Sequence, residues 1–405
     1  MSGPLSGVTI LSAEQMHAMP HATQLFALMG AEVVKVEPLA GESGRGGNPR
    51  FVDRDGREVG STFVRNNLGK ASVALDLKSP SGRDLFLRLA QRADAVTENF
   101  RPGTADRLGI GYEDVRTVNP SVVYTSISGF GNRSDPPSPY REWAAYAPIV
   151  EGMSGLYEYT RRGDGPPLVA LAGALGDTGS GLYATIGTLA ALFERQRTGR
   201  GCYVDVSMYD SMIALADIVH VASMGTEPSR TLEGIGIVHS FRASDGWFVV
   251  EVVREPHFPR FASAVGHPEW TEDERFATRA GWDEHMETVI RPAVEAWAAR
   301  LTKLQASEEL ARHGVAAGPV NTASDIRADP HVRERGFVHE FTAPDGSREV
   351  AVVGNPIAFR REDDAAESEV PSWPLLGADT DRILSERLGL SPDELRTLRD
   401  QGAIA

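Results

Sequence analysis

The stretch GVTILSAEQMHAMPHATQLFALMGAEVVKVE, residues 7–37, changes from a strand pattern to a helix pattern and back. Residues 7–12, GVTILS, are rich in apolar and β-branched side chains, as in a buried strand. Residues 21–30, HATQLFALMG, have a helical pattern that ends at Gly30, because glycine is favoured just after a helix. Residues 31–37, AEVVKVE, return to the strand pattern. The stretch therefore predicts one strand–helix–strand unit.

The same alternation continues to about residue 210. Further strand patterns occur at SVALDL (72–77), DAVTENF (94–100), SVVYTSISGFG (121–131) and CYVDVSM (202–208). Between the first two of these, Ser79 suits the N-cap of a helix and Pro80 suits its first turn. Strands that alternate with helices form parallel βαβ units. We therefore predict an α/β fold with an open, mainly parallel, Rossmann-like sheet.

The pattern changes near residue 222, where a stretch rich in Gly, Ser and Pro predicts a linker. One strand and several helices follow, and they predict a smaller α+β domain. The expected organisation is a large α/β domain at 1–222, a linker at 223–240, a small domain at 241–335, a return linker at 336–372 and a C-terminal segment at 373–405.

The composition is that of a globular protein, with 41% hydrophobic and 24% charged residues in 405. No apolar run approaches the roughly 18 residues that cross a membrane, and the N-terminus has no secretion signal. The single cysteine, Cys202, excludes an internal disulfide and is consistent with a cytoplasmic protein. The net charge of −15 argues against nucleic acid or an anionic membrane surface as the partner.

Several common motifs are missing from the sequence. No glycine-rich turn is followed by the lysine of a phosphate-binding P-loop, and no Gly-x-Gly-x-x-Gly follows the first strand. There is no Gly-x-Ser-x-Gly nucleophile elbow. His17 and His21 are four residues apart, but no third ligand has metal spacing, so we expect no metal site.

A single acid, Asp177, stands where a glycine-rich bend meets a helix in GALGDTGSGLYATIGTLAALFERQRTGRG (173–201). Asp is a favoured N-cap residue, so its role could be structural. A helix N-terminus also favours a negative charge, and the surrounding glycines leave room for a substrate to reach a nucleophilic carboxylate. The pattern leaves both roles open. One apolar face of the helix contains Leu182, Ile186, Leu189 and Phe193.

Along its length the sequence resembles the family III CoA transferases, which include formyl-CoA transferase, carnitine CoA transferase and α-methylacyl-CoA racemase. The resemblance rests on LSGVTIL, ATQLFALMGAEVVKVEP, SVALDLKSPSGRDLF, TENFRPGTADRLGIGYEDVRTVNPSVVYTSISGFG, GMSGL, the 173–201 stretch, GVAAGPVNTASDI and PLLGADTDRIL. It implies that Asp177 is the catalytic nucleophile. The acid would carry CoA as an aspartyl-CoA thioester while CoA moves from an acyl-CoA to a carboxylic acid. Backbone amides of the bend could hold the oxyanion.

The resemblance also implies that the large domain binds CoA as a substrate, with no tightly bound cofactor. Ordinary structural roles remain open for several of the matching positions. Lys78 and Arg107 could be solvated charges, Phe100 could belong to the core, and Asn99 could be a turn residue. The matching positions are His17, Ala18, Leu75, Lys78, Asn99, Phe100 and Arg107, with Arg45 as a weaker candidate for a phosphate.

The sequence departs from the family pattern at Pro38, where some members have an arginine, and at His17, which replaces a glutamine of formyl-CoA transferase. That enzyme also has a run of glycines over its active site. The comparable stretch LEGIGIVHS has only Gly234 and Gly236. We therefore do not expect formate or oxalate as substrates.

The alternative reading is a racemase of the same family, which needs a histidine before GMSGL. That position holds Tyr146, followed by Ala147, although Glu255 resembles a supporting acid of the racemases. We favour the transferase. A non-catalytic CoA-binding protein is a third reading, less favoured because the Gly-Asp pair is intact.

The acceptor pocket must hold an anion in a protein of negative net charge, so it needs a local arginine. A dicarboxylic acid is our preferred acceptor. The family also forms homodimers of interlocked rings, so we expect the C-terminal segment to pack on the large domain. The candidate arginines are Arg50, Arg65, Arg141, Arg161 and Arg162.

Overall fold

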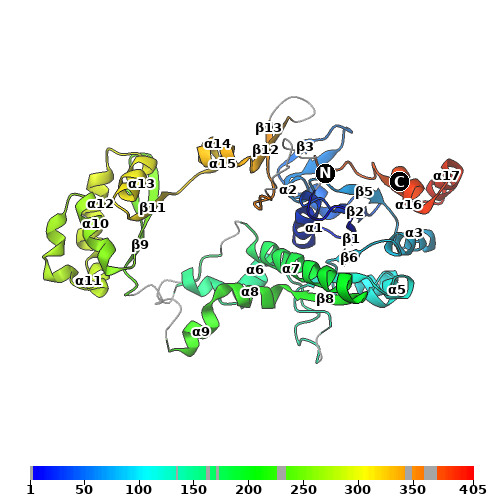
Figure 1. Ribbon diagram of the computed structural model, residues 1–405, viewed down its shortest axis with the longest axis horizontal. Coiled ribbons are helices and arrows are strands. Elements are labelled where there is room, and N and C mark those ends of the chain that lie inside the picture. Colours follow the sequence, from blue (N-terminus) through cyan, green and yellow to red (C-terminus); the bar gives the residue numbers. More distant parts are fainter. Residues whose placement is uncertain are drawn as a thin grey trace. The chain divides into compact units, whose positions relative to one another are not determined.

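The computed structural model describes residues 3–133, 136–160, 165–169, 173–225, 234–342, 349–359 and 372–405. Its residues form two compact units (Figure 1). Unit 1 contains Met1–Thr160, Pro166–Ile218 and Gly336–Ala405, and unit 2 contains Arg161–Gly165 and Val219–Arg335. No described helix is both long and apolar enough to span a membrane.

Unit 1 is built on a six-stranded sheet in which every neighbouring pair of strands is parallel. The strand order is β5-β2-β1-β6-β7-β8. Two halves therefore wind outward from the β1/β6 pair, which is the Rossmann order. The prediction of an open parallel α/β sheet is confirmed. The strands are β1 (Thr9–Ala13), β2 (Glu32–Glu37), β5 (Ala71–Ala74), β6 (Ala95–Glu98), β7 (Val123–Ser128) and β8 (Cys202–Ser207).

Helices cover both faces of this sheet, so side chains from both sides of each strand are buried. On one face, Ile10 and Val33 pack against Phe26 of α1 and Ala191 of α7. On the other face, Leu11 belongs to a cluster with side chains of α3, α5, α16 and α17. The helices are α1 (Ala18–Leu28), α3 (Pro80–Ala90), α5 (Tyr112–Val118), α7 (Leu175–Thr198), α16 (Thr380–Leu388) and α17 (Pro392–Asp400).

The long helix α7 packs through small residues. Its buried residues include Gly176, Gly179, Gly181 and Ala184, and α1 lies alongside it (Figure 1). A Cβ atom at Gly181 would lie 2.8 Å from the carbonyl oxygen of Ala18, so only glycine allows this approach.

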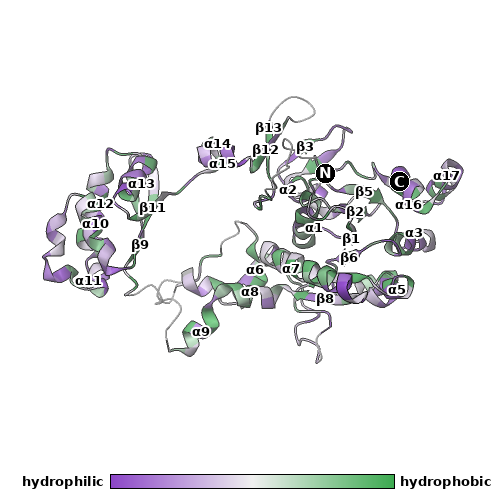
Figure 2. Ribbon diagram, viewed as in Figure 1, coloured by the Kyte–Doolittle hydropathy of each residue, from purple (hydrophilic) through white to green (hydrophobic). Residues whose placement is uncertain are grey.

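The apolar face that the sequence indicates for α7 points mainly outward. Leu182 is 49%, Ile186 62% and Phe193 63% exposed, whereas Leu189 is partly buried. Apolar residues are visible along the helix in Figure 2. The pattern therefore predicts the helix correctly, but unit 1 itself does not bury this face.

The end of the chain packs on the edge strand β5. The amide of Ser72 donates to Asp379 Oδ2 at 2.9 Å, and the amide of Ala74 donates to Thr380 Oγ1 at 3.1 Å. Leu75 forms an isolated antiparallel bridge with Ile404. The C-terminal segment thus covers an edge that would otherwise present unpaired backbone groups.

The other elements of unit 1 surround the site described below. Strands β3 and β4 form one antiparallel pair, and β12 and β13 form another. Val352 of β13 packs with Val64 of α2 and with Trp373. The elements are β3 (Arg50–Val52), β4 (Glu58–Gly60), α2 (Ser61–Asn66), α4 (Thr104–Leu108), α6 (Ala147–Met153), α8 (Met208–Ala216), β12 (Val338–Thr342) and β13 (Glu349–Val353), with short helices at Ser43–Gly46 and Leu156–Thr160.

Unit 2 combines an antiparallel sheet of order β11-β10-β9 with helices around an aromatic core, which confirms a smaller α+β part. Strand β9 begins at Ile237, and the region 336–372 contains β12 and β13, so both segments interpreted as linkers include strand residues. The elements are α9 (Ile218–Ser223), β9 (Ile237–Ala243), β10 (Gly246–Val252), α10 (Phe258–Ala264), α11 (Arg279–Glu284), α12 (Arg291–Ala298), α13 (Lys303–Arg312), β11 (Ala316–Pro319), α14 (Ala323–Ala328) and α15 (Pro330–Arg335), with short 3₁₀ or π segments at Glu255–His257, Pro268–Thr271, Glu274–Phe276 and Met286–Ile290.

Candidate active site

The turn between β1 and α1 lies at the switch point of the sheet, where open α/β folds bind their ligands. Asn99, just after β6, clamps this turn. Its Oδ1 accepts from the Gln15 amide and its Nδ2 donates to the Gln15 carbonyl, both at 2.9 Å. Met16 adopts a left-handed conformation (φ 62°), and its amide donates to Glu42 Oε2 at 3.0 Å. The turn is therefore fixed, and it places His17 at the N-cap of α1.

Asp177 is not the cap of α7. The helix begins at Leu175, so the N-cap is Ala174, in a left-handed conformation with φ 43°. The amide of Gly176 donates to Glu151 Oε1 at 2.9 Å, and the amides of Asp177 and Thr178 donate to the Ala174 carbonyl. These three amides are occupied, so they do not supply the oxyanion site that we expect from the glycine-rich bend.

The carboxylate of Asp177 has no hydrogen-bond or ion-pair partner among the described residues. Burial raises its pKa to about 6; the charge of Glu151 raises it as well, and the charge of Arg65 lowers it. The carboxylate is mostly ionised at neutral pH and more basic than a solvated aspartate. Such a group can act as a nucleophile.

Glu151 holds the bend that carries Asp177. It is buried, with an exposed fraction of 3%, and its Oε2 accepts from the hydroxyl of Tyr157 at 2.6 Å. Its other oxygen accepts from Gly176. Glu151 thus links α6, the Leu156–Thr160 segment and the start of α7, and it contributes the negative charge near Asp177.

Two histidines, His17 and His21, lie close to each other and to the charge of Arg65. The rings of His17 and His21 are 6.3 Å apart. Burial, followed by the charge of Arg65, lowers the pKa of each histidine to about 4, so both are neutral at pH 7. Nε2 of His17 is buried without a hydrogen-bond partner in the described part of the chain. His17 can therefore offer a neutral imidazole to a ligand.

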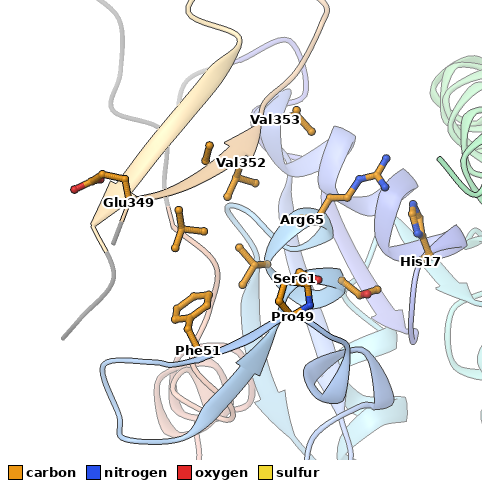
Figure 3. A pocket seen from close by; sticks show the side chains of 12 residues that line it. His17, Pro49, Phe51, Ser61, Arg65, Glu349, Val352 and Val353 are labelled. Atoms are coloured by element: carbon orange, nitrogen blue, oxygen red, sulfur yellow. The ribbon is translucent and has the colours of Figure 1, made fainter. Parts of the chain in front are cut away.

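Arg65 and His17 line a cavity of about 530 Å³. The guanidinium of Arg65 extends towards the imidazole of His17 (Figure 3). The remaining walls are largely apolar, apart from two hydroxyls and one carboxylate. They comprise Pro49, Phe51, Ser61, Thr62, Val64, Glu349, Val350, Ala351, Val352 and Val353.

The positions implied for CoA lie in different surroundings. Leu75 is buried in the core, and Phe100 packs partly buried against the same cluster. Lys78 is exposed, and Arg107 is exposed with a hydrogen bond to Thr104 Oγ1 at 2.8 Å. Ala18 is buried at the start of α1, beside His17. The roles of these residues toward CoA remain predictions.

Arg45 is engaged inside unit 1. Its Nε and Nη2 donate to the two oxygens of Glu37 at 2.7 and 2.8 Å, and Nη2 also donates to the Pro374 carbonyl at 3.2 Å. The guanidinium lies 3.7 Å from the ring centre of Phe63. Arg45 would have to leave these partners to reach a phosphate.

A buried ionic cluster that the sequence does not predict lies beneath the turn. Lys70 Nζ lies 2.7 Å from Glu14 Oε1, and Lys35 lies near both Glu14 and Glu42. Burial raises the pKa of Glu14, but the two lysines lower it more, to about 2; burial lowers the pKa of Lys70 to about 7. The one sequence signal is Lys35, a charge in the middle of an apolar strand.

The other candidate arginines differ from Arg65. Arg50 pairs with Glu58 at 3.2 Å, and Arg141 lines a second cavity, of about 420 Å³, beside Glu98. Burial, together with the charges of the nearby Asp106 and Asp205, raises the pKa of Glu98 to about 8. Arg161 and Arg162 lie outside the described residues.

The two residues at positions that matter in the racemases, Tyr146 and Glu255, are both exposed. Tyr146 is the N-cap of α6 and is 66% exposed. Glu255 is an exposed residue of unit 2 that pairs with Arg279 at 2.8 Å. No group of three or more His, Cys, Asp or Glu in the described ranges could hold a metal ion.

The family profile described as CoA-transferase family III matches residues 5–380. The chain is 33% identical to the succinyl-CoA:mesaconate CoA-transferase of Haloarcula hispanica, covering 88% of this chain and 90% of the relative. It is 33% identical to the succinyl-CoA–D-citramalate CoA-transferase of Chloroflexus aurantiacus, covering 99% and 98%. The crystal structure of a CAIB/BAIF family protein from Brucella suis matches with a TM-score of 0.82 at 30% identity, covering 96% of this chain and 100% of that one.

Proposed function

Because this chain belongs to family III of the CoA-transferases, enzymes that move CoA between acyl-CoA thioesters and carboxylic acids, we propose that Asp177 carries the CoA as an aspartyl-CoA thioester. The observation that carries this proposal is the state of the Asp177 carboxylate. It is unpartnered among the described residues, its pKa is raised to about 6, and it neighbours Arg65.

In our proposal the reaction passes through two covalent intermediates on Asp177, a mixed anhydride and then a thioester. A carboxylate oxygen of Asp177 attacks the thioester carbonyl carbon, the carbon–sulfur bond breaks, and a mixed anhydride and CoA thiolate form. The thiolate then attacks the Asp177 carbonyl carbon, the anhydride bond breaks, and the first acid leaves as its carboxylate. The acceptor carboxylate enters by the reverse sequence. Each step is easier than direct exchange, which is the purpose of covalent catalysis.

The neighbouring groups support this chemistry. The positive charge of Arg65 lowers the pKa of Asp177 and so favours the ionised nucleophile. His17, neutral at pH 7, can donate a ring N–H to the oxygen that gains charge as the carbonyl is attacked. This role requires the tautomer of His17 that carries its proton on Nε2, the nitrogen without a hydrogen-bond partner in the described part of the chain. Glu151 fixes the bend through the Gly176 amide.

The CoA moiety occupies the switch-point crevice in our proposal. His17 and Ala18 stand at the end of β1 and Asn99 at the end of β6, where the crevice opens. The exposed Lys78 and Arg107 are free to approach the phosphates, since neither forms an ion pair in the described ranges. The relatives named above act on succinyl-CoA with mesaconate or D-citramalate, so we propose a dicarboxylic acceptor.

We also propose a cytoplasmic homodimer of interlocked chains. The outward apolar face of α7, with Leu182, Ile186 and Phe193, supports a partner surface, because monomers rarely expose large continuous apolar patches. The single Cys202 fits a reducing compartment.

Intact mass spectrometry tests the covalent role. Wild-type protein mixed with an acyl-CoA and quenched in acid should gain the mass of CoA, and peptide mapping should place it on Asp177. Asp177→Asn should fold and gain no CoA. An active Asp177→Asn protein, or CoA on another residue, would overturn the proposal.

A further inference from the structure

Arg65 is a cation without an anionic partner in the described part of the chain. It stands half-buried on α2, where removal from water is costly for an unpaired charge. Lys35 and Lys70 nearby are each paired with buried glutamates, and Arg45 is paired with Glu37. Arg65 lines a cavity without such a pairing, whereas the charges of the other three cations are held by glutamates.

The cavity fits a short carbon chain that ends in a charged group. Arg65 supplies the charge on one side, and Val64, Val350, Val352 and Phe51 supply apolar wall. A guanidinium presents two parallel N–H donors that match a carboxylate, which makes it a specific partner for that group. His17 connects this cavity to the start of α7. Its ring lies 6.3 Å from that of His21, and a Cβ atom at Gly181, one turn after Asp177, would lie 3.2 Å from His21. The charge of Arg65 also lowers the pKa of Asp177.

We infer that Arg65 is a specificity-determining residue, which binds the second, non-reacting carboxylate of a dicarboxylic substrate while the first carboxyl group reacts at Asp177. The inference rests on the proposed role of Asp177. It assigns the selection of dicarboxylic over monocarboxylic acyl groups to one side chain. The second carboxylate forms no covalent bond in this arrangement and remains ionised throughout the exchange.

The other arginines do not fit this task. Arg50 is paired with Glu58, and Arg45 is held by Glu37 and Pro374. Arg141 lines the second cavity, whose lining includes neither His17 nor Arg65. Of these four arginines, Arg65 is the one that shares a cavity with His17 and whose charge lowers the pKa of Asp177.

The test uses single-turnover formation of the CoA adduct on the whole protein, with succinyl-CoA and butyryl-CoA as donors of equal chain length. At pH 8 the wild type should form the adduct faster with succinyl-CoA. Arg65→Gln should lower the succinyl/butyryl ratio of rate constants about 10- to 100-fold, the value of a hydrogen-bonded charge pair. Arg65→Lys should keep part of the preference, because it retains the charge without the fork.

The ratio separates selectivity from general effects. Loss of Arg65 also raises the pKa of Asp177, but that change slows both donors alike and leaves their ratio unaffected. Arg54→Gln, an exposed arginine outside the cavity lining, is the matched control and should leave the ratio unchanged.

Each outcome is decisive. An adduct that forms with no preference for succinyl-CoA in the wild type overturns the inference without any variant, so misfolding of Arg65→Gln cannot hide the answer. An unchanged ratio in a folded Arg65→Gln protein also overturns it. If the wild type forms no adduct with either donor, or forms it away from Asp177, the proposed function itself fails.

Discussion

Asp177 and Arg65 lie close enough for their charges to interact, yet they form no ion pair among the described residues. A tight pair would occupy the carboxylate and lower its nucleophilicity. A carboxylate without any cation would stay protonated to higher pH because of its burial. The observed relationship keeps Asp177 available and mostly ionised at neutral pH, and it leaves Arg65 available to a substrate anion.

The first prediction concerns the pH dependence of adduct formation. The pKa of Asp177 is about 6, and the ionised form is the nucleophile, so the rate should fall as the pH decreases through about 6. Stopped-flow or quenched reactions between pH 5 and 8.5 measure the midpoint. In Arg65→Gln the midpoint should move to higher pH, because Arg65 lowers this pKa. Arg54→Gln should not move it, and a profile flat down to pH 4.5 would contradict the assignment.

The second prediction concerns stability. A folded-state pKa of about 6, above the ordinary value of 3.8, means that the native state loses stability as the pH rises from about 4 to 6, and that the loss is complete above pH 6. Asp177→Asn should therefore raise the free energy of unfolding at pH 8 by about 1–2 kcal/mol, allowing for partial exposure. The gain should shrink as the pH decreases from 6 to 4, where the wild-type carboxyl is protonated in both states. Urea unfolding at both pH values measures it; equal effects at both would count against the raised pKa.

The parallel sheet could be predicted from the sequence because each strand and helix has its own local period. Its Rossmann order could not, since strand order depends on contacts between distant segments such as β1 and β6. The sequence pattern also did not predict which face of α7 is buried. Small residues such as Gly181 and Ala184 pack on that face, while the larger apolar residues point outward.

The site was predictable only in part. Asp177 stands out beside its glycines, and the family resemblance implies its role. Glu151, 26 residues earlier, has no sequence signal for its bond to Gly176, because that bond depends on how α6 meets α7. Arg65 was one of five equal candidates until the fold placed it beside Asp177. Asn99 matches a CoA position, and in the structure its side chain binds the Gln15 backbone.

The third prediction concerns the outward face of α7. If a second chain covers this face, the double variant Ile186→Glu and Phe193→Glu should place two charges in an apolar contact and weaken the dimer strongly. Sedimentation velocity should then detect monomer or partly unfolded chains at concentrations where the wild type is a dimer. Thr117→Glu, an exposed change on α5, is the control. A double variant that remains fully dimeric would exclude α7 from the interface.

The fourth prediction concerns the last residues of the chain. Ile404 is 2% exposed and bridges Leu75 at the end of β5, although it is the penultimate residue. Truncating a buried isoleucine costs about 2–5 kcal/mol, so Ile404→Ala should lower the free energy of unfolding by an amount in that range. Ile326→Ala, at a position 43% exposed in α14, should cost much less. Chemical denaturation measures both variants.

The consequence extends to function, because Leu75 is also a position that we expect to line the CoA nucleotide pocket. Loosening the bridge at Ile404 should raise the KM for acyl-CoA more than it lowers kcat, since β5 is remote from the reacting carboxylate in sequence and carries no proposed catalytic group. If Leu75 belongs only to the core and does not contact CoA, Ile404→Ala should lower the stability and leave the KM for acyl-CoA unchanged. A cost below about 0.5 kcal/mol, typical of a surface substitution, would mean that the chain end does not anchor β5 in solution.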